Sequence, residues 1–259
     1  MLIICASLVA SYSLTKNASV YQSKALSAVD PAFTIIAYQQ DFSTATYLDP
    51  YFWTPFSGAE TWNGEKQYYY APNVTVSGGT LNLIGKRESV GGYNYTSGKI
   101  NSRLPIKYGK FEVVAKVPHG RGVWPAIWLY DGNGSYGEID IMEYIGNTPN
   151  YLFSTIHFGK DGNSLTSIPK DIYKQNAWKD YHTYTLEWTA NKIEIYIDGA
   201  SVFFQDMAAT RINGISPLDK PLTFMINNAL GGDWPGQISN HIFPAEFKIK
   251  SIKVWKWNP

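Results

Sequence analysis

Three carboxylates lie close together in one short apolar stretch, residues 137–146, which reads Gly-Glu-Ile-Asp-Ile-Met-Glu-Tyr-Ile-Gly. Branched and aliphatic neighbours of this kind favour a strand over a helix. Side chains two residues apart share a face of a strand, so Glu138 and Asp140 point the same way. Glu143 lies five residues from Glu138 and would face the opposite side, unless a β-bulge at Ile141-Met142 adds one residue. We therefore predict a bulged strand that carries all three carboxylates on one face.

Carboxylates placed side by side repel one another and raise one another's pKa, which costs the fold free energy. Glycoside hydrolysis makes use of such a pair. A retaining enzyme needs an ionised nucleophile and a protonated acid roughly 5–5.5 Å apart, whereas an inverting enzyme needs roughly 6.5–9.5 Å to seat a water. The spacing of the carboxylates in the sequence is compatible with both the retaining and the inverting mechanism. Because the stretch contains no Lys or Arg, catalysis is favoured over a solvated strand face with counter-ions.

The carboxylate stretch and the segment before it resemble the signature of one enzyme family. The run Glu-Ile-Asp-Ile-Met-Glu, preceded by Trp-Pro-Ala-Ile-Trp-Leu at residues 124–129, closely resembles glycoside hydrolase family 16, specifically its bulged, laminarinase-like branch. Further segments follow in the order that such proteins show, at residues 95–100, 108–112, 157–159, 227–236 and 251–255. The resemblance therefore covers most of the chain.

The resemblance implies an all-β fold, a β-jelly roll sandwich of two antiparallel sheets with a concave sugar-binding cleft. It also implies retaining hydrolysis of a β-glucan. In this scheme Glu138 is the nucleophile, Glu143 is the acid/base, and Asp140 hydrogen-bonds to the nucleophile and tunes it. The pKa of Glu138 must then be lower than that of Glu143, so that the nucleophile is ionised while the acid keeps its proton. The negative charge of Glu138 raises the pKa of Glu143, as this requires.

Three tryptophans are candidates for sugar platforms. Trp124 and Trp128 are four residues apart and share one face of a regular strand, which is either the cleft or the core. The resemblance favours the cleft for both residues, and Trp234 matches a cleft position less closely. Aromatic residues make up 15% of the chain, and strand propensity and core filling account for most of them.

Three polar residues complete the candidate substrate site. A lone His on a strand is usually structural, but the resemblance places His157 beside the acid/base, where it would orient Glu143 or bind sugar. Asn63 and Lys99 match sugar-contacting positions less closely. Many relatives have Arg at the position of Lys99, so this contact lacks the bidentate guanidinium fork.

Length and composition bound the fold and the partners. The chain has 259 residues, 44% of them hydrophobic and 17% charged, which suits one β-domain over residues 33–259. The net charge is +1 without a basic run, so nucleic acid is excluded as an expected partner. We expect a monomer whose partner is a β-glucan polysaccharide or oligosaccharide.

The first 32 residues are predicted to be a signal remnant and a flexible leader. Residues 1–10 are apolar, as in a signal peptide, but the charged segment that should precede them is missing. Ile4 stands where a lipoprotein signal needs a small residue before Cys5, which argues against a lipid anchor. No other apolar run approaches the ~20 residues of a membrane span. We expect a secreted protein that has no membrane partner in its mature form.

Short strands separated by turns run from residue 33 to the end of the chain, which favours a sandwich or barrel. Residues 151–158 are expected to pair antiparallel with the carboxylate strand. Residues 161–176 are expected to be irregular, and residues 208–213 to form one short helical turn.

No cofactor and no metal are expected to be required for the reaction. Many relatives hold a structural calcium through an aspartate in the last strand. Lys250 stands at the matching position, and a lysine would repel the ion. We predict that this calcium site is absent or altered.

The leading hypothesis is a retaining endo-glycosidase that hydrolyses internal β-1,3-linkages of laminarin-type β-glucans, with mixed-linkage β-1,3-1,4-glucan as a further substrate. Agarases and carrageenases of the same family share the bulged spacing, but sulfated galactans would need basic cleft residues. A non-catalytic β-glucan-binding protein is the alternative from another class, although such relatives typically lack one or both glutamates. A transglycosylase would use the same residues.

Overall fold

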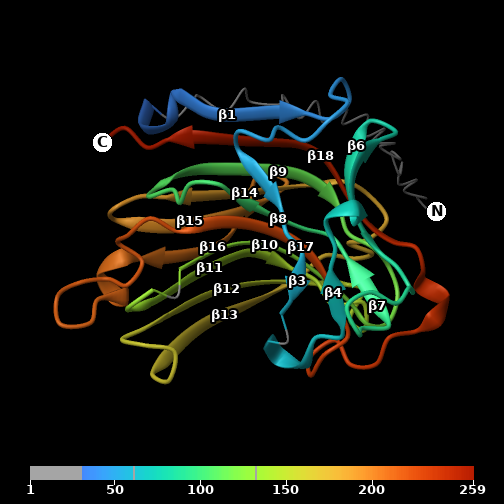
Figure 1. Ribbon diagram of the computed structural model, residues 1–259. Coiled ribbons are helices and arrows are strands. Elements are labelled where there is room, and N and C mark those ends of the chain that lie inside the picture. Colours follow the sequence, from blue (N-terminus) through green and yellow to red (C-terminus); the bar gives the residue numbers. More distant parts are fainter. Residues whose placement is uncertain (1–30, 61, 132) are drawn as a thin grey trace, which may run out of the picture.

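The computed structural model describes residues 31–60, 62–131 and 133–259 (Figure 1). The predicted signal remnant and leader therefore lie outside the described residues, apart from Pro31 and Ala32, which begin the short helix η1 (Pro31–Phe33). In the part of the chain that the structure covers, no helix is long and apolar enough to cross a membrane.

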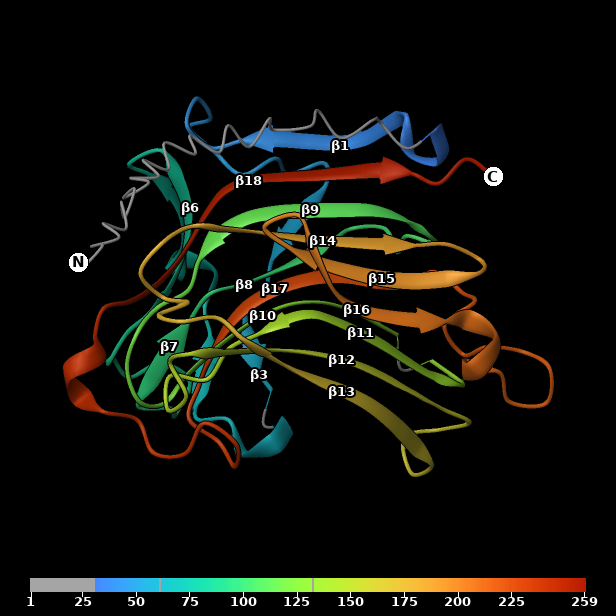
Figure 2. The same ribbon diagram turned by 180° about the vertical axis from the view of Figure 1, so that it is seen from behind.

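Two curved antiparallel sheets stack on each other, as Figure 1 and the view from behind in Figure 2 show. The first sheet contains, in spatial order, β16 (Ala200–Asp206), β15 (Lys192–Ile197), β14 (His182–Trp188), β9 (Gly109–Lys116), β18 (Ala245–Lys256), β6 (Thr80–Gly85) and β5 (Val74–Ser77), with β1 (Ile35–Asp41) paired to β18. The second contains β13 (Leu165–Tyr173), β12 (Tyr151–Gly159), β11 (Tyr136–Glu143), β10 (Val123–Asp131), β17 (Thr223–Leu230), β8 (Lys99–Ser102) and β2 (Trp53–Pro55). The predicted jelly roll sandwich is confirmed.

Smaller elements flank the sandwich. A three-stranded sheet consists of β3 (Gly58–Ala59), β4 (Gln67–Tyr69) and β7 (Tyr95–Ser97). Within the described residues, the remaining helical segments are single 3-10 turns, η2 (Trp62–Gly64), η3 (Ala71–Asn73), η4 (Met207–Thr210) and η5 (Asn240–Ile242). A helical turn was expected at residues 208–213, and η4 begins one residue earlier and ends at Thr210; the Asp206 carboxylate accepts a hydrogen bond from the Ala208 amide.

The core lies between the two sheets, and strict alternation builds it. In β9 every second residue is buried, and Phe111, Val113 and Ala115 point inward. From the opposite sheet, Ile139 of β11 and Ile127 of β10 are fully buried in the same apolar cluster. Because these side chains fill the interior, their strand neighbours must point outward, and in β11 those neighbours are acidic.

The predicted bulge in β11 is confirmed. Against β10, Met142 pairs with Ile127 and Asp140 pairs with Trp128, so Ile141 is an extra residue. The register with β12 shifts over the same residues, between Asp140 and Glu143. The inserted residue turns the Glu143 side chain onto the face of Glu138 and Asp140, as the spacing requires.

The expectation of an irregular segment at residues 161–176 is wrong, because residues 165–173 form β13. This strand is the edge of the second sheet, and most of its side chains are exposed. An edge strand needs no alternation of apolar residues, and it tolerates a proline such as Pro169. The segment therefore lacks the alternation of apolar residues that predicts a strand, and it contains a proline, which argues against one.

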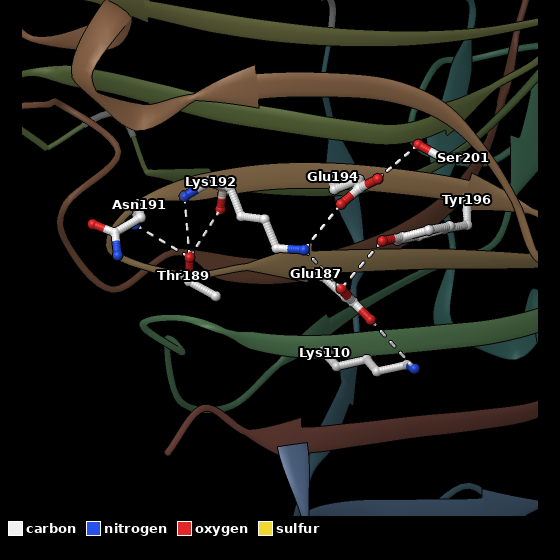
Figure 3. Close-up of polar contacts among 8 residues, drawn as sticks. All are labelled: Lys110, Glu187, Thr189, Asn191, Lys192, Glu194, Tyr196 and Ser201. Carbon is white, nitrogen blue, oxygen red and sulfur yellow. Dashed lines mark hydrogen bonds and ion pairs between the residues drawn. The ribbon is translucent and has the colours of Figure 1, made fainter. Parts of the chain in front are cut away.

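A network of ion pairs lies on the outer face of the first sheet (Figure 3). The carboxylate of Glu187 is largely buried and lies 3.5 Å from the Lys110 ammonium and 3.2 Å from that of Lys192. The Tyr196 hydroxyl donates to the same carboxylate over 3.3 Å. Lys192 also pairs with Glu194 at 2.9 Å. These groups come from three adjacent strands, so the network links β9, β14 and β15 side by side.

Replacing Glu187 with Ala is expected to lower the free energy of unfolding by about 1–2 kcal/mol, because two ammonium groups and a hydroxyl lose their shared acceptor. Urea denaturation followed by tryptophan fluorescence measures this change. Glu112→Ala, on the same face of β9, is the control, with an expected change below about 0.5 kcal/mol. Equal losses in the two variants would show that the network adds nothing to stability.

Candidate active site

A cleft of about 920 Å³ lies on the face of the second sheet that points away from the core. Its walls come from β8, β10, β11, β12, β13 and β17 and from the segment at residues 60–69. Glu138, Asp140 and Glu143 all line it. The bulge therefore brings the three carboxylates into one solvent-connected cavity of a size suited to a sugar chain.

Glu138 has a hydrogen-bonding partner and two titratable neighbours. The Tyr136 hydroxyl donates to its Oε2 over 2.5 Å, and oxygen and nitrogen atoms of Glu138, Asp140 and His157 lie within 4.8 Å of one another. Burial raises the pKa of Glu138, while Tyr136, the nearby His157 imidazole and Asp140 oppose that rise. Burial and the adjacent Glu138 charge raise the pKa of Asp140 further, well above its ordinary value. The pKa of Asp140 is thus raised more strongly than that of Glu138, which favours Glu138 as the first of the two to ionise.

Glu143, the third carboxylate of the row, also has a raised pKa. Burial is the main cause of a pKa well above the ordinary value, and the charges of Asp140 and Glu138 act in the same direction. The indole Nε1 of Trp124 donates to Glu143 Oε1 over 3.0 Å, which only partly offsets the rise. Charge repulsion from Glu138 acts in the predicted sense, but desolvation is the larger effect. The raised pKa of Glu143 is in the direction that a general acid needs.

His157 contacts Asp140, rather than Glu143 as expected. The pairing of β11 with β12 places His157 directly opposite Glu138. The bulge lies between this pair and Glu143. Its Nε2 lies 3.2 Å from Asp140 Oδ2, and its Nδ1 lies 2.7 Å from the Ser167 hydroxyl. Glu138, Asp140 and His157 offer ligand atoms within 4.8 Å of one another, a set that could also ligate a divalent cation.

The three candidate tryptophans line the cleft. Trp124 and Trp128 lie on β10, where the register keeps them on the outer face. The Trp128 indole donates to Asn227 Oδ1 over 2.7 Å. Trp234 packs edge-on against Trp124, with ring centroids 5.5 Å apart, and is 39% exposed. Hydrogen bonds and the ring contact thus hold these indoles in the wall of the cavity.

The polar candidates also line the cleft, in different settings. Lys99 is only 2% exposed, and its ammonium lies 2.6 Å from Glu60 Oε2 and 5.3 Å from the centre of the Trp128 ring. It is therefore already paired before any sugar enters. Asn63 has a φ of 53°, a left-handed conformation that Asn tolerates better than most residues. Its carbonyl accepts from the Asp233 amide over 2.8 Å, which joins two loops of the cleft rim.

A chain of hydrogen bonds in the wall of the cleft was not predicted from the sequence. Asn227, which holds Trp128, donates through Nδ2 to the Tyr69 hydroxyl over 3.0 Å, and that hydroxyl donates to Glu65 Oε2 over 3.1 Å. Gln67 donates to the same oxygen, and burial raises the pKa of Glu65 to about 7. Tyr69 and Asn227 are 158 residues apart, so no local pattern could reveal the chain. Tyr136 was detectable, because it precedes Glu138 by two residues on the same strand face.

The Tyr69→Phe variant is expected to raise the KM for laminarin roughly fivefold and to change kcat little, because Asn227 loses its acceptor and no longer fixes the Trp128 ring. Initial-rate kinetics on laminarin separate the two constants. The matched control is Tyr184→Phe, since Tyr184 is equally buried but its hydroxyl has no hydrogen-bond partner. The same KM in both variants would contradict a role for the chain in substrate binding.

Fold and site together point to a class of protein, because neighbouring carboxylates in an open cleft are the arrangement that glycoside hydrolases use. The family model for glycosyl hydrolases family 16 matches residues 61–244. The chain belongs to that family.

Relatives agree with this assignment. A beta-glucanase of Rhodothermus marinus is 31% identical over 86% of this chain and 85% of its own length. Glucan endo-1,3-beta-glucosidase A1 of Niallia circulans is 32% identical over 84% of this chain, but the match spans only 37% of that longer protein. The crystal structure of the laminarinase catalytic domain from Thermotoga maritima superposes with a TM-score of 0.78 at 30% identity, covering 86% of this chain and 98% of the other.

Proposed function

We propose that this protein is an endo-β-1,3-glucanase that hydrolyses internal linkages of laminarin-type glucans with retention of anomeric configuration. Mixed-linkage β-1,3-1,4-glucan is a further substrate of the same cleft. The observation that carries the proposal is the bulge in β11, which places Glu138, Asp140 and Glu143 together in the cleft. The relatives named above support the glucan as the substrate class.

In the first step the Glu138 carboxylate attacks the anomeric carbon of the sugar. Glu143 gives its proton to the glycosidic oxygen as the bond between that oxygen and the anomeric carbon breaks. The leaving chain departs as an alcohol, and Glu138 is left as a glycosyl ester. Asp140 supports this step by donating a hydrogen bond to Glu138, which stabilises the carboxylate before attack and again when it is released.

In the second step a water molecule attacks the anomeric carbon of the ester. Glu143, now ionised, takes a proton from that water and returns to its starting state, while Glu138 leaves as a carboxylate. Two inversions at one carbon give net retention. The imidazole of His157 lies on the Asp140 side of the row, where it holds that carboxyl in place.

The charges in the cleft favour a neutral polysaccharide. Among the described residues that line it, the acidic groups include Glu60, Glu65, Asp131 and Asp233 in addition to the catalytic row. The one lysine in the lining is paired with Glu60. A sulfated galactan would bring further negative charge against these carboxylates, which Coulomb repulsion disfavours.

We further propose that the protein acts outside the cell as a monomer and needs no cofactor, since carboxylates alone supply the acid, base and nucleophile. The calcium site of many relatives is proposed to be absent or altered. Lys250 stands at the matching position on β18, and its ammonium lies 4.1 Å from the centre of the Tyr181 ring, so a positive charge that would repel calcium stands there.

Reducing-end release from laminarin, lichenan, carboxymethyl cellulose and agarose tests the proposed substrate. Rapid release from laminarin, with less from lichenan and none from the other two, is the expected pattern. Laminarin binding without release would favour a binding protein. Formation of products longer than the starting oligosaccharide would favour a transglycosylase, and release from agarose alone would favour a galactanase.

A further inference from the structure

A row of aromatic rings leads out of the cleft toward the edge of the second sheet. It begins at Trp124, which hydrogen-bonds to Glu143. The Trp234 ring lies 5.5 Å from Trp124, and the Phe153 ring lies 4.8 Å from Trp234, both in edge-to-face contacts. The row therefore crosses from β10 to β12 beside the proposed acid/base.

The row continues to the sheet edge. Phe153 lies opposite Glu143 in register and so shares the cleft face, and Tyr151, two residues earlier on β12, points the same way at about 6.8 Å along the strand. Tyr151 in turn pairs with Tyr173 on the edge strand β13, with ring centroids 5.6 Å apart. Figure 1 shows β12 and β13 side by side at this edge.

The outer end of the row is exposed and has a carboxylate beside it. Tyr151 is 41% exposed and Tyr173 is 64% exposed. Asp171 lies opposite Phe153 in register and is also exposed. Exposed aromatic faces take the C–H faces of sugar rings, and a carboxylate accepts hydrogen bonds from sugar hydroxyls. A cross-strand tyrosine pair alone would only stabilise the sheet, but here it continues an aromatic path from the cleft.

We propose that Tyr151, Tyr173 and Asp171 form a second carbohydrate-binding surface, the edge platform, which holds a distal part of the same neutral β-glucan chain whose cleavable bond lies in the cleft. This inference rests on the proposed function of the cleft. The occupant follows from continuity with the cleft through Phe153 and Trp234. The negative charge of Asp171 disfavours a sulfated or uronic acid polymer.

The position of the edge platform predicts a dependence on chain length. A short oligosaccharide fills the cleft without reaching the sheet edge, whereas a polymer engages both surfaces. The platform should therefore raise the affinity for polymers alone, in the way that a second linked site does.

The test compares the double variant Tyr151→Ala/Tyr173→Ala with the wild type. Two readouts are used, depletion of the protein from solution by insoluble β-1,3-glucan and kinetics on laminarin and on laminaritriose. We expect adsorption to be three- to tenfold weaker and KM on laminarin to rise by a similar factor, which corresponds to the free energy of about one aromatic contact. The rates on laminaritriose should be unchanged. Phe204→Ala is the control, because Phe204 is 61% exposed on β16 of the other sheet.

Three outcomes would contradict the proposal that the edge platform binds glucan. These are adsorption equal to that of the wild type, a loss equal to that of the Phe204 variant, or an equal loss of rate on laminaritriose. Adsorption does not require hydrolysis, so it reports on the platform separately from the proposed reaction. If the wild type adsorbs and the double variant does not, the platform stands even where no reducing ends are released.

Discussion

The Glu138→Gln variant is expected to lose laminarinase activity by a factor on the order of 10⁴, the scale seen when one member of a catalytic unit is removed. The amide cannot form the glycosyl ester, so the first step has no nucleophile. Gln has the same shape and can still accept the hydrogen bond from Tyr136. The fold and the binding of laminarin should therefore survive, which circular dichroism and adsorption to insoluble glucan would check.

A complementary variant separates loss of chemistry from loss of structure. Glu138→Ala opens space beside the anomeric carbon, and added azide, a small anionic nucleophile, should restore turnover and release a glycosyl azide of inverted, α configuration. The convex-face variant Glu112→Gln serves as the control for altered net charge. Activity within about tenfold of the wild type in Glu138→Gln would remove this residue from the nucleophile role.

The Glu143→Gln variant is expected to lower kcat on laminarin by about 10²–10⁴, the usual worth of a general acid. The poor leaving group of a polysaccharide needs the proton that Glu143 supplies. An aryl glycoside with an acidic phenol leaves without protonation, so its first step should lose much less. Comparing pre-steady-state bursts on the two substrates measures this difference. An equal loss on both would indicate that Glu143 does not protonate the leaving group.

The same variant should change the pH profile. Activity needs Glu143 protonated, so the rate falls as pH rises through the raised pKa of this group. It also needs Glu138 ionised, so the rate falls as pH drops through the pKa of Glu138. The expected profile of kcat/KM is a bell, and Glu143→Gln should remove its alkaline limb. Retention of that limb in the variant would assign it to another group.

The spacing of the carboxylates along the strand was sufficient to predict the bulge. Because Glu138 and Glu143 are five apart, they share a face only with an inserted residue, and the apolar run around them left one place for it. The segments that resemble the family supplied the sandwich and the cleft. A prediction of this kind works where local pattern and chemistry coincide, as they do in β11.

Contacts that depend on long-range register could not be predicted. The partner of His157 follows from the pairing of β12 with β11, which places it opposite Glu138. The link from Trp128 to Glu65 passes through Asn227 and Tyr69, residues that only the folded sheets bring together. The edge strand β13 lacks the alternation that marks a buried face. In each case the missing information is tertiary.

The most direct test of the proposed retaining mechanism is the anomeric configuration of the first product from laminarin. Proton NMR monitors this configuration during the first minutes of hydrolysis. The bulged carboxylate row, with Glu138 as nucleophile, predicts that the β-anomer signal grows first and that the α-anomer appears only later, by mutarotation. An α-anomer that appears first would show that water attacks directly, and the double-displacement account of this site would then be wrong.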